Sequence, residues 1–239
     1  MIRLACLAVL LLATLPLVSP PLAAAEKKHK DDPAPPAFKT LMTTRGASLF
    51  EELFTPETFT KNCDVHGGIF EVVDGTLRSG DKPGGDHHPQ TVHRVKMHDV
   101  VVECRFRIDG ASWMGFSFGD KEHIARVMIN KDQVEVVKMS GIGATTKGER
   151  LDRLPMKWEP GRWYTMVIEF RGPELLAHID NQWVLHGESP TFDADKTSIL
   201  LINGGTHAWF DDLKINEAVA DPKWEKKKPA VLAQKEKRK

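Results

Sequence analysis

The chain has 239 residues, and its 33 lysine and arginine residues are matched by 33 aspartate and glutamate residues, so its formal net charge is zero. A chain without excess positive charge lacks the electrostatic field that draws proteins to nucleic acid, so we expect no nucleic-acid partner. Its three cysteines are too few for a disulfide scaffold and do not have the spacing of a metal site.

The first 25 residues have the order of a secretory signal peptide. Arg3 precedes an apolar run over 4–18, and three alanines at 23–25 come directly before the charged Glu26. The alternative is a membrane anchor, but prolines interrupt a run that is already shorter than the ~20 apolar residues a span needs. We therefore expect cleavage after Ala25, no membrane span, and a secreted or periplasmic protein.

Polar segments flank the part of the chain that could form a core. Residues 26–45 are charged and proline-rich, which is typical of a linker. Residues 219–239 are rich in lysine, and their mutual repulsion predicts a disordered tail. The tail is interpreted as a solubilising end, with adhesion to anionic envelope polymers as the alternative. The intervening residues, 46–218, have a normal size for one domain.

Residues 46–218 alternate between apolar and polar side chains, as antiparallel strands do when one sheet face is buried. The clearest example is 100–108, and 163–170 repeats the pattern. The turn pairs Asp74-Gly75 and Asp180-Asn181 lie between apolar-rich runs, where a hairpin would reverse the chain. Further strands are expected at 49–54, 69–73, 91–96, 114–118, 123–129, 134–139, 175–179, 198–202 and 209–215.

These patterns predict one all-β domain. About ten strands are too many for an immunoglobulin-sized sandwich and favour a larger jelly-roll sandwich of two antiparallel sheets. Six alternating apolar residues are expected in its core: Val102, Phe106, Tyr164, Met166, Ile168 and Ile179.

The order of several motifs resembles one family of exported bacterial proteins. These motifs are Phe70-Glu71-Val72-Val73-Asp74-Gly75-Thr76-Leu77, Asp86-His87-His88-Pro89, the strand at 100–108, His123-Ile124-Ala125-Arg126-Val127, Trp158-Glu159-Pro160-Gly161-Arg162-Trp163, Ala177-His178-Ile179-Asp180 and Phe210-Asp211-Asp212-Leu213-Lys214-Ile215. Together they resemble the 3-keto-disaccharide hydrolase domain family, whose fold is a concanavalin A-like jelly roll. The resemblance covers nearly all of 46–218.

The resemblance implies an activity on glycosides that are already oxidised to a ketone at sugar carbon 3. That ketone acidifies the hydrogen on carbon 2, so a base can remove it and expel the substituent on carbon 1 by elimination, after which water adds. The family's Gly-Phe-Glu-x-Gln strand is replaced here by Gly115-Phe116-Ser117-Phe118. The alternative is therefore a non-catalytic carbohydrate-binding or cell-surface interaction module.

Two histidines are the candidates for the base. His88 belongs to the densest group of imidazoles, which titrate near neutral pH and so suit proton transfer. His123 opens a predicted strand. A solvated loop for His88 and an edge-exposed position for His123 are the alternatives.

Arg105, Trp163 and His178 are the candidates for binding the sugar. Each alternates with apolar residues, so each should leave the core, and an aromatic ring beside charged groups suits a carbohydrate. We expect them to line one groove with His88 or His123 at its edge. The alternative is an ordinary solvated sheet face.

Two further features stay open at this point. Cys63 and Cys104 could form a disulfide, or Cys104 could be a small core residue. Adjacent carboxylates at Asp211 and Asp212 suit calcium but do not make a site by themselves, so no metal is assigned. The sequence indicates no particular cofactor.

Overall fold

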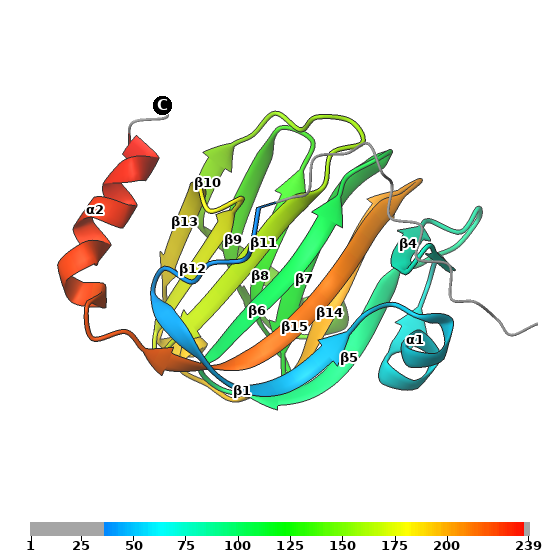
Figure 1. The fold of residues 1–239 in the computed structure, drawn as a ribbon. Coiled ribbons are helices and arrows are strands. Elements are labelled where there is room, and N and C mark those ends of the chain that lie inside the picture. The colour runs from blue at the N-terminus through cyan, green and yellow to red at the C-terminus, as the bar shows by residue number, and fades with distance from the viewer. Residues whose placement is uncertain (1–35, 237–239) are drawn as a thin grey trace, which may run out of the picture.

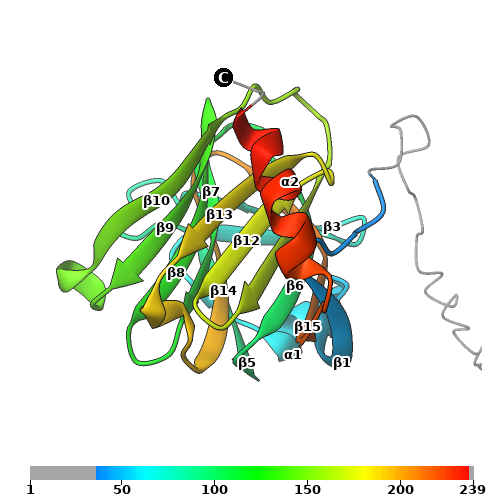
Figure 2. The same cartoon turned by 90° about the vertical axis from the view of Figure 1, so that its left-hand side faces the viewer.

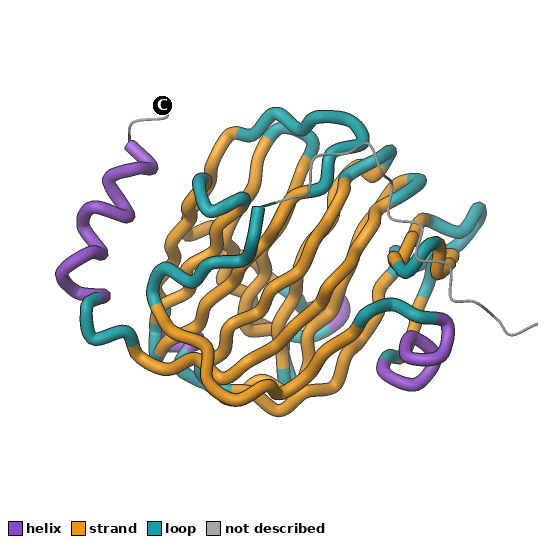
Figure 3. The backbone as a smooth tube through the Cα atoms, viewed as in Figure 1, coloured by secondary structure: helices purple, strands orange, loops and turns teal. Residues whose placement is uncertain are grey.

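The computed structural model describes residues 36–236. The expected signal peptide and the first half of the expected linker, 26–35, lie outside the described residues. Fifteen strands form two antiparallel sheets that pack face to face, and few residues are helical (Figures 1 and 3). The predicted all-β sandwich is therefore confirmed.

Sheet A contains eight strands, seven of which follow one another in a single order. Its order is β13 (Trp183–Glu188), β12 (Glu174–Ile179), β11 (Tyr164–Arg171), β6 (Val100–Arg107), β15 (Ala208–Ala220), β4 (Thr76–Gly80) and β3 (Ile69–Val73). In addition, β1 (Thr43–Glu52) pairs with the second part of β15.

Sheet B has the order β10 (Lys147–Pro155), β9 (Gln133–Ser140), β8 (His123–Asn130), β7 (Ala111–Gly119), β14 (Lys196–Gly205), β5 (Gln90–Met97) and β2 (Asp64–His66). A short helix, α1 (Pro56–Asn62), follows β1, and α2 (Trp224–Glu236) follows β15. No helix in the described range is long and apolar enough to span a membrane.

The core lies between the sheets and is built from alternate residues of their strands. All six predicted core residues are buried there: Val102, Phe106, Tyr164, Met166, Ile168 and Ile179. Phe106 of sheet A stacks on Tyr164 and meets Phe116 of sheet B edge to face at 6.4 Å between centroids. Aromatic contacts of this kind add specific geometry to the apolar area that the core buries.

The predicted hairpin turns are confirmed by their backbone angles. Asp74 and Gly75 have φ of 50° and 74°, and Asp180 and Asn181 have φ of 50° and 58°. Asp, Asn and Gly tolerate this left-handed region better than other residues, which is why they mark tight reversals. The first pair joins β3 to β4, and the second lies between β12 and β13.

The structure resolves the choice left open for the cysteines. Cys104 is fully buried among the core residues of β6, and Cys63 is half-buried after α1; both thiols are free. Cys104 is thus a small core residue.

The lysine-rich end is helical over Trp224–Glu236, so the expectation of a disordered tail from 219 onward was wrong for this part. In α2, Trp224 and Val231 are buried against Leu176 and Val184 on the outer face of sheet A, with Met42 completing the cluster (Figure 2). Apolar burial therefore outweighs the mutual repulsion of the lysines.

The lysines of α2 also have partners that reduce this repulsion. Lys228 pairs with Glu174 of β12 at 2.7 Å, and Lys227 pairs with Asp221. The pair with Glu174 connects the polar side of α2 to sheet A, on which its apolar side packs.

Candidate functional site

The outer face of sheet A carries a row of residues that crosses five neighbouring strands. Arg107 of β6, Trp209 of β15, Arg78 of β4 and Glu71 of β3 are successive register partners, and Trp163 precedes β11 next to Arg107. The Arg107 guanidinium lies 5.2 Å from the ring centroid of Trp163 and 4.3 Å from that of Trp209. We call this set the Trp163 row.

The charges of the Trp163 row are already satisfied within the protein. Arg107 pairs with Asp109 at 2.7 Å, and Arg78 pairs with Glu71. Arg78 also lies 5.5 Å from the Trp209 centroid, so two guanidinium groups contact that ring. Cation–π contacts of this kind stabilise the sheet face and compete with a ligand for the indole surfaces.

Arg105 and Trp163, two of the predicted sugar-binding residues, do share this outer face. Arg105 pairs with Asp212 at 3.0 Å and lies 5.8 Å from the ring centroid of Phe38. Its guanidinium thus has internal partners on both sides, and part of its surface is taken by the segment before β1.

His178 points to the same side but is fully buried, so the expectation that it contacts a ligand was wrong. Burial lowers the pKa of His178 to about 4. Its cover is the segment before β1. The backbone N–H groups of Leu41 and Met42 in this segment, and of Thr43 at the start of β1, donate to the carboxylate of Glu169 at 2.7 to 3.0 Å. Alternation gives the side of a sheet on which a residue lies, but not what covers that side.

The outer face of sheet B presents a different arrangement, centred on Trp113. Gly204 of β14 is the register partner of Trp113 on β7. A Cβ atom on Gly204 would lie 2.5 Å from Trp113 Nε1 and 3.2 Å from His88 Nδ1. The indole therefore extends sideways over β14 into space that only a glycine leaves free, and His88 reaches the same point.

His88 is held beside this indole by a carboxylate. Its ring meets Trp113 edge to face at 5.1 Å between centroids, and its Nδ1 lies 3.2 Å from Asp81 Oδ1. Asp81 Oδ2 in turn accepts the Gly205 N–H at 2.6 Å. A carboxylate on Nδ1 orients the imidazole, Nε2 makes no hydrogen bond to a described residue, and the side chain as a whole is 63% exposed. We call Trp113, His88 and Asp81 the Trp113 platform.

This placement corrects the expected groove. His88 belongs to the sheet B side, so it does not lie at the edge of a groove formed by Arg105 and Trp163 on sheet A. His123 opens β8 and also belongs to sheet B. It is half-buried, and burial followed by the charge of Arg126 lowers its pKa.

The sequence contained signals for the two residues of the platform that were missed. Trp113 precedes Met114, Phe116 and Phe118, whose alternation into the core puts Trp113 on the opposite face. Asp81 lies seven residues before His88, across a glycine-rich loop. Nothing in the sequence brings this loop next to Gly204, because that contact depends on the register of β14.

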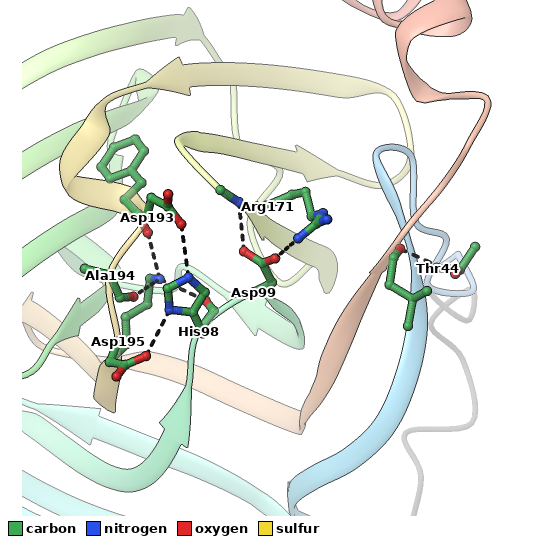
Figure 4. Close-up of polar contacts among 11 residues, drawn as sticks. Thr44, His98, Asp99, Arg171, Asp193, Ala194 and Asp195 are labelled. Carbon is green, nitrogen blue, oxygen red and sulfur yellow. Dashed lines mark hydrogen bonds and ion pairs between the residues drawn. The ribbon is translucent and has the colours of Figure 1, made fainter.

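A third cluster lies near the β5–β6 turn. His98, Asp99 and Asp193 have potential metal-ligand atoms within 4.8 Å of one another. The two ring nitrogens of His98 contact Asp193 at 3.0 Å and Asp195 at 2.9 Å, and Asp99 pairs with Arg171 (Figure 4).

Cationic groups of the protein neutralise this third cluster. The ammonium of Lys196 donates to the backbone oxygens of His98, Phe192 and Ala194 at 2.8 to 2.9 Å. The ammonium is attracted by the carboxylates of this cluster, as a metal cation would be. It also connects the β5–β6 turn to the segment before β14. This cluster is therefore interpreted as a structural link.

The sequence matches no protein-family model and no curated protein. Solved structures do match the fold. A protein with a galectin-like fold from Bacillus subtilis has a TM-score of 0.58 at 12% identity, and the match covers 75% of this chain and 100% of that one. The chain has a concanavalin A-like jelly-roll fold.

Two further structures share the fold. The carbohydrate-binding module CBM66 from Bacillus subtilis has a TM-score of 0.52 at 14% identity, over 65% of this chain and 96% of that one. LamA from Z. galactanivorans, in complex with laminaritriose and laminaritetraose, has a TM-score of 0.53 at 12% identity, over 73% of this chain and 100% of that one. At these identities the likeness establishes the architecture alone.

Proposed function

We propose that this chain is an extracytoplasmic carbohydrate-directed domain that binds sugar at the Trp113 platform. The observation that carries the proposal is the convergence of Trp113 and His88 over Gly204. An indole that extends across a sheet offers a ring face on which the apolar face of a pyranose can stack. The side chain of His88 is exposed, and its Nε2 can hydrogen-bond a sugar hydroxyl beside the indole.

The similar structures support this class of ligand. They include a carbohydrate-binding module and a protein solved with bound laminarin oligosaccharides. The export part of the proposal rests on the order of charge, apolar run and alanines in the first 25 residues. N-terminal sequencing of the native protein tests it, and an intact Met1 in a cytoplasmic fraction would overturn it.

The binding proposal is tested by calorimetric titration of neutral and charged oligosaccharides with two matched variants. Trp113→Ala removes the platform, and Trp163→Ala removes a half-buried tryptophan from the opposite sheet. We expect Trp113→Ala to weaken binding about five-fold or more, because loss of stacking costs about 1 kcal/mol or more. The reverse order of effects would place the site on sheet A, and no binding by the wild type would overturn the proposal.

Cleavage of 3-keto-glycosides is the second candidate function, and the contact between Asp81 and His88 favours it. A carboxylate that orients the imidazole lets Nε2 act as a base, which is what removal of the carbon 2 hydrogen of such a sugar requires. The electron pair then expels the substituent on carbon 1, and addition of water to the resulting double bond gives net hydrolysis.

This candidate is tested by incubating the purified domain with a 3-keto-disaccharide, with and without added divalent metal. We expect turnover by the wild type and a loss of about 100-fold or more in the His88→Ala variant. Turnover of the variant at the wild-type rate would remove His88 from catalysis. No turnover by the wild type under any metal condition would leave the binding function alone.

A further inference from the structure

The outer face of sheet B contains a half-buried arginine that forms no ion pair with a described carboxylate. Arg126 of β8 is half-buried, and its Nε makes no hydrogen bond to any described residue. Burial lowers its pKa, and no carboxylate offsets that effect. Apart from Arg126 and the exposed Arg153, every arginine within 36–236 forms an ion pair with a carboxylate: Arg45, Arg78, Arg94, Arg105, Arg107, Arg150, Arg162 and Arg171.

The register partner of Arg126 is a second group without a partner. Ser117 of β7 lies directly opposite Arg126, and its side chain is on the outer face because Phe116 and Phe118 point into the core. The Ser117 hydroxyl is fully buried and makes no hydrogen bond to a described residue. A buried hydroxyl of this kind costs free energy unless a ligand or water satisfies it.

These two groups lie on the same sheet face as the Trp113 platform. A Cβ on Gly115 would lie 3.7 Å from Cγ of Arg126, so the arginine stem passes beside Gly115. Trp113, Gly115 and Ser117 are alternate residues of β7 and follow one another along the same sheet face, about 7 Å apart. Trp113 and Ser117 are therefore about 14 Å apart along β7, so an oligosaccharide that runs along this strand could reach both the indole and Arg126.

The positive charge of Arg126 therefore has no counter-charge among the described residues, and an anionic ligand could supply one. Arg126 supplies hydrogen-bond donors, and its positive charge adds to burial in lowering the pKa of His123. A neutral sugar would leave the guanidinium without a counter-charge, whereas a carboxylate or a sulfate would accept from it in a bidentate manner.

We propose that Arg126 forms a subsite for the negatively charged substituent of an acidic sugar bound at the Trp113 platform. This inference rests on the proposed binding function and specifies its ligand class, namely glycans that carry uronate carboxylates or sulfate esters.

The test compares charged oligosaccharides with neutral ones of the same sugar. Oligogalacturonides are paired with their methyl esters, and sulfated galactan oligosaccharides with their desulfated forms, so the two arms distinguish carboxylate from sulfate. Arg126→Gln is the test variant. Arg94→Gln is the matched control, because Arg94 lies on the same sheet but is 74% exposed and paired with Asp64.

We expect the wild type to prefer one charged series, and Arg126→Gln to lower its affinity for that series about ten-fold or more without changing its affinity for the neutral form. Arg94→Gln should leave this preference unchanged. Raising the ionic strength should lower the affinity of the wild type for the charged oligosaccharide more than it lowers the affinity of Arg126→Gln for the same oligosaccharide.

Three outcomes would overturn the inference. Binding of neutral sugars that depends on Trp113, with no preference for charge, would uphold the proposed function and remove the anionic subsite alone. If Arg126→Gln lowers the affinity for the charged and the neutral series equally, Arg126 supports the structure of the sheet and does not bind the charged substituent. Absence of binding to every oligosaccharide would overturn the subsite and the binding function together.

Discussion

Glu169 of β11 accepts the backbone N–H of Thr43 at 2.7 Å, and this contact joins the first described segment of the chain to the middle of sheet A. The Thr43 hydroxyl donates to the same Oε2 at 2.7 Å. The carboxylate is fully buried, and burial raises its pKa. One side chain therefore holds the cover that separates His178 from solvent.

Replacing Glu169 should detach this cover. Glu169→Ala leaves several buried N–H groups without an acceptor, so we expect a loss of about 2 to 4 kcal/mol in the free energy of unfolding, measured in urea. Proteolysis near Leu41 should become faster. Glu149→Ala is the control, because Glu149 is exposed and paired only with Lys138. Equal stability of the two variants would show that the segment is held by other contacts.

His178 and His93 should make the protein sensitive to mild acid. Burial lowers the pKa of each to about 4, from 6.5 in the unfolded chain. The unfolded state therefore binds more protons between these values, so the stability present above pH 6.5 is lost as the pH falls toward 4. His178→Phe, which keeps a ring but cannot titrate, should flatten this dependence in denaturant titrations at several pH values. An unchanged slope would contradict the prediction.

Gly204→Ala should weaken sugar binding without unfolding the protein. The new methyl group would occupy the space of Trp113 Nε1 and would crowd His88, so the indole must move off β14. We expect a loss of affinity similar to that of Trp113→Ala, by the same titration. Gly148→Ala is the control on the same sheet, since its Cβ would meet only the flexible side chains of Val137 and Met139 at 3.0 Å or more. Wild-type affinity in Gly204→Ala would show that the ring position is unimportant.

Phe106→Ala should be strongly destabilising. Phe106 is fully buried and contacts aromatic rings from both sheets, so its removal leaves a cavity that the sandwich cannot close. We expect a loss of about 3 to 5 kcal/mol in the free energy of unfolding. Ile142→Ala, at a 63% exposed position, should change it by less than about 0.5 kcal/mol.

Much of the fold was predictable because each sheet buries one face and exposes the other. The alternation of Val102, Cys104 and Phe106 with Glu103 and Arg105 locates β6 within a residue or two of its ends. Strands without such alternation were missed. The strand β10 is mostly charged, and β2 is only three residues long.

The helix α2 was missed for a related reason. Lysine dominates its composition, and its buried residues Trp224 and Val231 are seven positions apart, which is two helical turns. The complementary signal lay in Leu176 and Val184, apolar residues on the outer face of sheet A. They require a cover, which α2 provides.

The candidate site could be predicted only in part. The grouping of histidines in the sequence indicated His88. Its neighbours in the structure come from β7 and β14, and the pairing of Trp113 with Gly204 cannot be predicted from local sequence. The choice between Trp163 and Trp113 likewise depends on which indole has guanidinium groups against it, and that is a property of the assembled sheets.

The segment before β1 and helix α2 both pack on the outer face of sheet A, opposite the Trp113 platform (Figures 1 and 2). These two elements therefore lie on the face opposite the one proposed for sugar recognition. An affinity tag, a fluorescent reporter or a solid support joined directly after α2 would start on the sheet A side. A long polysaccharide could then run across sheet B without meeting it.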